Sequence, residues 1–541
     1  MSSVNILRPS WSIGFSMAAA SSFTTSGHIQ DQAQMVKAKR MILKAGSLKP
    51  VEEGLGIKRW LRGPKQKDDA AKERVGDLSP RRDRVAILPF VNISPDPKDE
   101  YFADGMTEEL ISTLSKIHRL KVISRTSIMR YKQTAKSVEE IAKELNVGSI
   151  LEGSVRKAAN ELRITVKLID VQNDEHVWAQ DYERKVENVF AVQKEIAHNV
   201  VESLQVELLP GDKRSIEKQG TKNIEAYELY LKGRFLWNKR TKDSMAEAIE
   251  YFRAAAQKDP SFPLPHIGIA DCYSLLVINA YLTASEGYPK AKRAIARALE
   301  LDDSLAEAHA SLGLLKSDAD WDWPAAEREY RKAIKLNPNY ATAHQWYSIL
   351  LRATLGRVQE GITEAQKSLE LDPLSPVINV NLGDAYLALG DLDLAEKHIR
   401  RALELDPSLP GGFEGLVLLA VLRGSYQEAI ELLEKVDSMQ PLLHKKLKMG
   451  TAWIYAWSGN IEKARRIFQE TATIPGRDYI TAVDFARYYC AVGNIDLAFE
   501  MLDRAFENHD PELCTIRSDL TLRALYSDAR WAAFLRKMKI S

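Results

Sequence analysis

Cysteine is scarce in this sequence, and neither sign of charge is in excess. The chain of 541 residues has three cysteines, which lie far apart and form no C-x-x-C pair: Cys272, Cys490 and Cys514. We therefore expect neither a disulfide framework nor a zinc site, but buried thiols in a reducing compartment. The 75 lysines and arginines nearly balance the 74 aspartates and glutamates, which predicts no general attraction to nucleic acid or to anionic membranes.

Long hydrophobic runs are also missing. No stretch of about eighteen or more consecutive apolar residues occurs, so an integral membrane span is not expected. The first residues, MSSVNILRPSWSIGFSMAAASSF, end in an A-x-A-like pattern, but serines interrupt the short apolar part, as in a poor secretory signal. We predict a cytoplasmic protein, with an exported or periplasmic form as the alternative.

The length of the chain predicts two or more folding units, because single cores stop growing at about 250 to 300 residues. Residues 1–83 have no sustained periodicity and carry excess lysine and arginine around MVKAKRMILKAG and IKRWLRGPKQK. We expect a flexible, mostly disordered leader there. The functional alternative is a basic tether for an acidic partner.

Residues 84–210 show the pattern of an α/β domain, a small mixed sheet with helices. RVAILPF and LKVIS indicate short strands, and SILEGSVRKA, ELRITVKLID and EHVWAQDYER indicate three strands in series. SVEEIAKELN has a serine cap and two early glutamates, which predicts a helix. A second helix is predicted by an apolar stripe that consists of Phe190, Ile196, Val200 and Leu204.

An acidic loop follows the first strand and carries four carboxylates: Asp96, Asp99, Glu100 and Asp104. A strand, a loop and a helix start can form a phosphate site, but that geometry needs glycine amides and a lysine, and carboxylates repel phosphate. The ligand spacing of a calcium loop is not present. We therefore expect Asp104 or Thr107 to cap the following helix and expect no catalytic role for the loop.

Two stretches carry a resemblance to a known family: VAILPFVNISPDPKDEYFADGMTEELISTLSKIHRLKVISRTSIMRYK and SILEGSVRKAANELRITVKLIDVQNDEHVWAQDYER. Residues 84–208 resemble the TolB amino-terminal-like (FlgO-like) domain that bacteria attach to tetratricopeptide arrays. Such domains often follow a nucleotide cyclase, a protein kinase or a winged-helix DNA-binding domain. Residues 1–83 are too short for a cyclase or kinase and carry no kinase motifs. The resemblance thus implies a sensory or assembly role without the effector.

Residues 222–541 are repetitive. RALELDDS, KAIKLNPN, KSLELDPL and RALELDPS place equivalent residues 35, 35 and 34 positions apart, at Asp303, Pro338, Pro373 and Pro407. That period predicts an all-α superhelical solenoid of about eight tetratricopeptide repeats (TPR). In the clearest unit, Gly383 and Ala395 allow two antiparallel helices to approach closely. We expect a C-terminal capping helix in SDARWAAFLRKMKIS to cover the last repeat.

The first helices of stacked TPR pairs line a concave groove, which suits a peptide or a partner helix. By register, seven residues face this groove and are the candidate partner-binding residues: Tyr227, Tyr230, Arg234, Trp237, Gln345, Arg352 and Asp384. Aromatic rings and arginine are common interface anchors, so those of the first repeat are candidate ligand anchors. The alternative is that these rings pack against the α/β domain across residues 211–224. The lysine and asparagine set by which chaperone-binding TPR domains grip a terminal carboxylate is not visible.

No catalytic, cofactor-binding or metal-binding residues are expected. His309 and His344 recur at one point of adjacent repeats, which is more typical of packing than of a metal site. We predict a non-enzymatic protein–protein interaction scaffold or adaptor in bacterial signalling, with a protein or peptide in the groove or with self-association. The alternative is the regulatory part of a nucleotide cyclase, kinase or transcription-regulator system whose output module is on another chain. A weaker alternative is that the chain is itself a cyclase, for which no metal-binding carboxylate pair is found.

Overall fold

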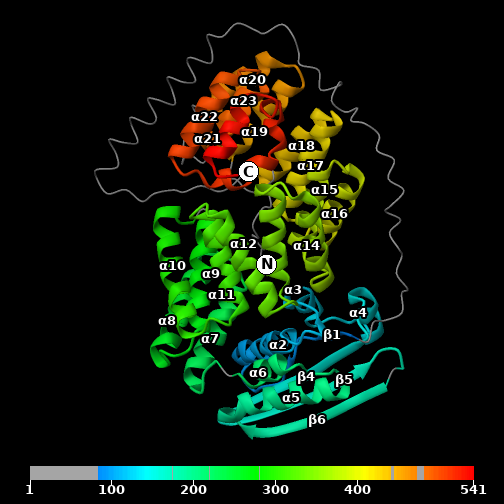
Figure 1. The fold of residues 1–541 in the computed structure, drawn as a ribbon. Coiled ribbons are helices and arrows are strands. Elements are labelled where there is room, and N and C mark those ends of the chain that lie inside the picture. The colour runs from blue at the N-terminus through cyan, green and yellow to red at the C-terminus, as the bar shows by residue number, and fades with distance from the viewer. Residues whose placement is uncertain are drawn as a thin grey trace.

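The structure of the protein is a computed structural model that describes residues 83–540, apart from residues 174, 219, 280, 440–443 and 472–479. Its first part is a small mixed sheet with helices, and a long series of paired helices follows (Figure 1). This arrangement confirms the predicted fold class. The predicted leader, except for Asp83, lies outside the described residues.

Six strands form one mixed sheet: β1 (Arg84–Ile87), β2 (Val91–Asn92), β3 (Lys121–Val122), β4 (Ser149–Ala158), β5 (Glu161–Asp170) and β6 (Glu175–Lys185). β1 lies between β3 and β4 and runs parallel to both. β4, β5 and β6 are antiparallel neighbours, and β2 pairs with the second half of β4. The sheet lies at one end of the molecule, with β6 as its outer edge strand (Figure 1).

Helices cover this sheet and lead into the solenoid. They are α2 (Glu100–Ser115), α3 (Arg125–Ile128), α4 (Val138–Leu145), α5 (Val189–Ser203) and α6 (Pro210–Glu217). The predicted cap of α4 is confirmed, because the Ser137 side chain accepts a hydrogen bond from the Glu140 amide and the Glu140 side chain accepts one from the Ser137 amide. Phe102, Met106 and Leu110 of α2 are buried in the core.

The prediction that Asp104 or Thr107 caps α2 is wrong, because the helix already begins at Glu100. Asp104 is an interior helical residue, and its carboxylate lies 2.6 Å from Nζ of Lys132. Thr107 is also interior, and its hydroxyl accepts a hydrogen bond from the Phe90 amide at 3.0 Å. Both side chains thus bind distant parts of the chain instead of the start of their own helix.

Antiparallel helix pairs form the rest of the chain (Figure 1). The pairs are α7 (Ile224–Trp237) with α8 (Lys242–Lys258), α9 (Leu264–Ile278) with α10 (Ala284–Leu301), α11 (Ala306–Asp318) with α12 (Trp323–Leu336), α13 (Ala341–Ile349) with α14 (Val358–Leu371), α15 (Pro376–Leu389) with α16 (Leu392–Leu405), α17 (Pro410–Arg423) with α18 (Tyr426–Met439), α19 (His444–Trp457) with α20 (Ile461–Thr471), and α21 (Ala482–Ala491) with α22 (Ile495–Glu507). Glycine permits the close crossings: a Cβ added to Gly383 would lie 2.6 Å from Cγ1 of Ile399.

After α22 the chain leaves the repeat pattern. It forms two 3-10 segments, η7 (Pro511–Ser518) and η8 (Leu520–Leu525), and a last helix, α23 (Ala529–Lys537). α23 lies against α22, with ion pairs of 2.8 Å from Arg530 to Asp496 and from Lys537 to Asp503. In the described part of the chain, no helix combines the length and apolar character that crossing a membrane requires.

The end of the chain also returns to the middle of the solenoid. Trp323 of α12 donates a hydrogen bond from Nε1 to the Met538 carbonyl at 2.8 Å. Thr354, which ends the π-helical turn η5 (Leu350–Thr354) after α13, donates from its hydroxyl to the Cys514 carbonyl. The solenoid therefore closes on itself, and its own C-terminal segment contacts the third and fourth helix pairs.

Candidate partner-binding site

Four of the seven candidate residues lie on α7, next to the α/β domain. The Tyr227 ring packs edge-on against Phe190 of α5, with 4.7 Å between centroids, and its hydroxyl accepts a hydrogen bond from Gln193 at 2.7 Å. Tyr230 is buried beside Phe262, with 5.3 Å between centroids. Tyr227 thus makes the contact with the α/β domain that the alternative interpretation expected, while Tyr230 packs inside the solenoid.

Arg234 and Trp237 occupy the last turns of α7. Nε of Arg234 donates to Glu108 of α2 at 2.8 Å, and Arg125 lies 3.2 Å from the second oxygen of Glu108. Burial raises the pKa of Glu108, but the two guanidinium groups outweigh it and hold that pKa below its usual range. Trp237 is partly exposed and contacts the guanidinium groups of Arg234 and Arg240.

The other three candidate residues lie on later first helices. Gln345 of α13 is partly exposed. Arg352 of η5 and Asp384 of α15 are buried, with 3.9 Å between Nη2 and Oδ2. Burial lowers the pKa of Arg352, and Asp384 opposes that shift. The structure brings Arg352 and Asp384 together, whereas Gln345 lies neither with this pair nor with the four candidate residues of α7. A partner-binding role for all seven residues stays a prediction.

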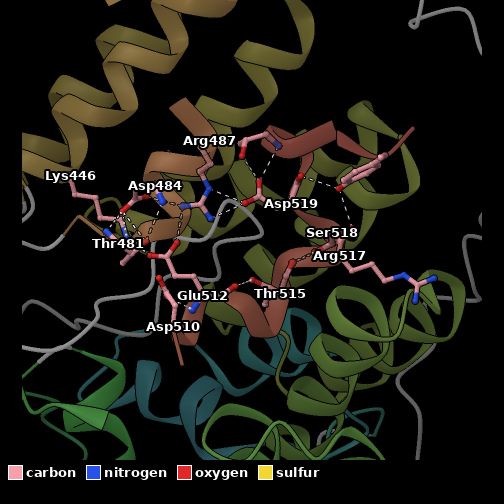
Figure 2. A network of polar contacts seen from close by, with 12 residues as sticks. Lys446, Thr481, Asp484, Arg487, Asp510, Glu512, Thr515, Arg517, Ser518 and Asp519 are labelled. Atoms are coloured by element: carbon pink, nitrogen blue, oxygen red, sulfur yellow. Dashed lines mark hydrogen bonds and ion pairs between the residues drawn. The ribbon is translucent and has the colours of Figure 1, made fainter. Parts of the chain in front are cut away.

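A buried ionic network connects α19 and α21 to the C-terminal segment (Figure 2). Nη1 of Arg487 lies 2.8 Å from Asp484 and 2.7 Å from Glu512, and Nη2 lies 2.8 Å from Asp519. Lys446 of α19 is the second cation and pairs with Glu512. All five side chains are no more than 1% exposed. Lys446 and Arg487, which lie on the first helices of their pairs, thus hold the irregular C-terminal segment. They do so through its carboxylates, Glu512 and Asp519.

The electrostatics of this network depend on all its members being present. Burial raises the pKa of Glu512 to about 8, although Lys446 acts in the opposite direction. Burial lowers the pKa of Arg487, but Asp519, Glu512 and Asp484 outweigh it and raise that pKa above its usual range. Removal of one partner would leave a buried charge, such as that of Asp519 after loss of Arg487, without compensation in a region of low dielectric. The network therefore fixes η7 against the last repeats.

Sequence reasoning missed this network. The acidic stretch DPELCTIRSD follows a degenerate repeat, and its partners Lys446 and Arg487 lie on helices without a clear repeat motif. Lys446, Asp484 and Arg487 stand among residues that are otherwise mostly apolar and buried. Charged residues within an apolar face are the signal that could have identified the network, because such residues are rarely buried without partners.

Repeat loops along one edge of the solenoid hold the α/β domain. In the loop after α16, Asp406 accepts a hydrogen bond from the Ser408 amide at 3.0 Å. In the loop after α14, Asp372 instead accepts bonds from the amide and the hydroxyl of Ser127, and that hydroxyl accepts one from the Leu374 amide at 2.9 Å. In the loop after α16, residues of the repeat make this turn by themselves. In the loop after α14, Ser127 of the α/β domain completes the turn.

Neighbouring parts of the solenoid extend this interface. Asn339, between α12 and α13, donates to the carbonyls of Ser115 and Leu120, both at 2.8 Å. Arg84 of β1 donates from Nη2 to the Glu370 carbonyl at 2.8 Å and pairs with the Glu370 carboxylate at 3.1 Å. The α/β domain is therefore fixed to several repeats at once.

The repeated histidines occupy equivalent positions. His309 lies between Glu329 (2.6 Å) and a backbone carbonyl (2.8 Å), and His344 lies between Glu364 (2.5 Å) and a backbone carbonyl (2.9 Å). Each ring joins a first helix to the second helix of its own pair. Among the residues that the structure describes, no group of three or more histidine, cysteine, aspartate or glutamate side chains could hold a metal ion.

Family models match two parts of the chain. Two models of the tetratricopeptide repeat match residues 322–376 and 379–409, which confirms the predicted repeats. A model described as "HilA/YgeH-like transcriptional regulator, second domain" matches residues 81–212. This match covers the α/β domain, for which the resemblance to the TolB amino-terminal-like domain stays a prediction.

Similar proteins share parts of the chain. "Putative adenylate cyclase 3" of Rhizobium meliloti (strain 1021) is 35% identical over 239 residues, which are 44% of this chain and 41% of the relative. "Transcriptional regulator HilA" of Salmonella typhimurium (strain LT2) is 21% identical over 67% of this chain and 64% of the relative. The chain thus spans less than two thirds of either relative. A solved tetratricopeptide repeat protein from Parabacteroides merdae ATCC 43184 is 17% identical, with a TM-score of 0.32 over 58% of this chain and 99% of that chain.

Proposed function

We propose that this chain is a non-enzymatic adaptor in bacterial signalling, in which the TPR solenoid and the α/β domain bind partners and hold them in fixed relation. The observation that carries the proposal is the interface in which Ser127 completes the repeat loop of Asp372. A free linker would transmit no orientation between two bound proteins, whereas an interface spread over several repeats does. TPR solenoids present extended concave surfaces that bind other proteins.

The candidate residues differ in what they can offer a partner. Tyr227 is engaged with the α/β domain, and Tyr230 is buried between repeats. Arg352 and Asp384 are buried. Trp237 and Gln345 keep exposed surface, so we propose these two as partner contacts.

A second function is favoured by the comparisons with known proteins. One relative is named as an adenylate cyclase and another as a transcriptional regulator, and the α/β domain matches a domain of such regulators. The chain would then be the regulatory part of such a system, with its output module on another chain. Both functions share the adaptor architecture and differ in the identity of the partner.

The test uses the full-length chain as bait in a lysate of its source cell, followed by calorimetry with the purified partner. A partner with a cyclase, kinase or DNA-binding module supports the regulatory function, and a partner without one supports the scaffold. Trp237→Ala should weaken binding, while Arg297→Gln, a change at an exposed arginine of α10, should not. Recovery of the bait alone would favour self-association. Formation of cyclic nucleotide from ATP with Mg²⁺ or Mn²⁺ by the pure chain would overturn its non-enzymatic role.

A further inference from the structure

The two repeated histidines, His309 and His344, each have an oxygen within hydrogen-bond distance of both ring nitrogens. Nδ1 faces a carboxylate, Glu329 in one pair and Glu364 in the other, and Nε2 faces a backbone carbonyl. The two histidine side chains are only 5% and 4% exposed, so water does not replace these partners. A carboxylate and a carbonyl both accept, so each ring satisfies both only with a proton on each nitrogen.

The carboxyl groups of these pairs favour the ionised form. The hydrogen bond from His309 holds the pKa of Glu329 below its usual range, although burial opposes it. Burial raises the pKa of Glu364, but the hydrogen bonds from His344 and Lys367 outweigh it and hold that pKa below its usual range. The shared proton of each pair therefore belongs to the ring. Three further cations act on Glu329 in the same direction: Lys316 of α11, and Arg328 and Lys332 of α12.

The carbonyl that His344 binds lies in a loop that holds the α/β domain. Nε2 lies 2.9 Å from the Pro338 carbonyl. The two asparagines beside this proline, Asn337 and Asn339, donate to the hydroxyl and the carbonyl of Ser115 at 2.9 and 2.8 Å. The bond from His344 thus fixes the backbone between two residues that dock the α/β domain.

His309 binds the preceding repeat loop in the same way. Its Nε2 lies 2.8 Å from the Asp303 carbonyl. The residues on either side, Asp302 and Ser304, each accept a hydrogen bond from Nζ of Lys218 at 2.6 Å. Lys218 directly follows α6, which leads from the α/β domain into the solenoid. Both histidines thus bind the backbone at a point where the solenoid holds the N-terminal part of the chain.

We infer that His309 and His344 form a proton-dependent clamp, which fixes these two loops while both ring nitrogens carry a proton and frees them when one proton leaves. A carboxylate is a stronger acceptor than a carbonyl, so the last proton stays on Nδ1 and the bond from Nε2 to the loop is lost. An unfolded histidine releases its second proton at about pH 6.5, whereas the folded clamp retains it. The stability that the clamp contributes is therefore complete below about pH 6.5 and is lost as pH rises until the folded clamp also releases its proton. The clamp needs no partner and is independent of the proposed adaptor function.

Nitrogen-15 NMR of the full-length, histidine-labelled protein observes these protons directly. The chain has ten histidines, and His309→Asn and His344→Asn identify the two signals that matter. At a pH of about 7.5, where an ordinary exposed histidine carries one ring proton, we expect two on each of these rings. A single proton on either ring at this pH overturns the inference.

Amide hydrogen exchange measures the docking itself. In peptides that cover residues 115–120, the opening equilibrium constant of the wild type should rise about tenfold between about pH 6.5 and pH 9, after correction for intrinsic exchange. His344→Asn should be open to this higher extent at both pH values, because asparagine, which occupies the equivalent position 379 of the next repeat, does not titrate. His176→Asn, at an exposed histidine of β6, is the matched control and should respond as the wild type does.

Asp372 also titrates near neutral pH at this interface, because burial raises its pKa to about 7. The exchange experiment is therefore repeated in Asp372→Asn, where the response of residues 115–120 should persist. Loss of the response in that variant would assign it to Asp372 and overturn the clamp, as would an equal pH response in His344→Asn. Circular dichroism shows whether His344→Asn is folded, and if it is not, the ring protons of the wild type decide.

Discussion

The loop edge and the last repeats of the solenoid hold other parts of the chain by different balances of chemistry. At the loop edge, Asp372 and Asn339 hold the α/β domain through hydrogen bonds to uncharged groups, and the ion pair of Glu370 with Arg84 lies beside them. In the last repeats, Lys446 and Arg487 hold η7 through ion pairs that are fully buried. The edge uses a turn that other repeats also form, whereas the last repeats use charged residues at buried positions of their first helices. Docking the α/β domain thus needs a small change in a repeat loop, but fixing a charged segment requires buried charges.

The largest effect is expected from Arg487→Met. This change removes a cation that contacts Asp484, Glu512 and Asp519 and leaves buried carboxylates without compensation. We expect the free energy of unfolding to fall by about 3–5 kcal/mol in urea titrations at neutral pH. Arg530→Met, which breaks exposed pairs only, is the control and should change the unfolding midpoint little. Equal losses in both variants would show that the buried network contributes no more than a surface pair.

The pH dependence of stability provides the next test, at the loop edge. Burial raises the pKa of Asp372 to about 7, from an ordinary value of 3.8. The folded state therefore holds a proton that the unfolded state releases between these pH values, so stability falls as pH rises through this window and levels off above about 7. Asp372→Asn removes this dependence. Between pH 5 and pH 8, the free energy of unfolding of the wild type should therefore fall by about 2 kcal/mol relative to that of the Asp372→Asn variant. A difference that is constant with pH would contradict the raised pKa.

The smallest effect is expected from Ser127→Ala. The loss of its hydroxyl leaves the Leu374 amide and one oxygen of Asp372 with fewer partners, which should cost about 1–2 kcal/mol and increase hydrogen exchange in α3. The matched control is Ser408→Ala, because Ser408 bonds to Asp406 in a loop that the α/β domain does not complete. Similar exchange rates in the two variants would show that Ser127 contributes nothing to docking.

Prediction from sequence succeeded where a pattern is short and local. The period of the repeats predicted the helix pairs, and the spacing of Ser137 and Glu140 predicted the start of α4. The start of α2 was missed because Asp104 and Thr107 are residue types that favour caps, yet here they bind Lys132 and Phe90 from inside the helix. Residue type alone cannot distinguish these uses, since the partner that decides between them lies elsewhere in the chain.

The candidate site was predictable only in part, for the same reason. The register of the first helices predicted that Arg352 and Asp384 share one face, and the structure shows the two side chains buried and 3.9 Å apart, whereas their place in a groove stays a prediction. The register could not show that Glu108 reaches Arg234, 126 residues away in the chain, or that Glu512 reaches Lys446. Such contacts depend on how the whole superhelix curves, and no local pattern encodes that curvature.

The contact between Trp323 and the Met538 carbonyl has a consequence for how the chain is made. In an open array each repeat is completed by its neighbour, so folding can spread from any point as synthesis proceeds. Here the third helix pair is completed by Met538, which follows Trp323 by 215 residues, so the Trp323 indole stays uncovered until α23 has been synthesised and has folded back. A chain that is truncated before α23 should therefore expose this surface to chaperones and proteases, whereas a chain that includes Met538 should cover it.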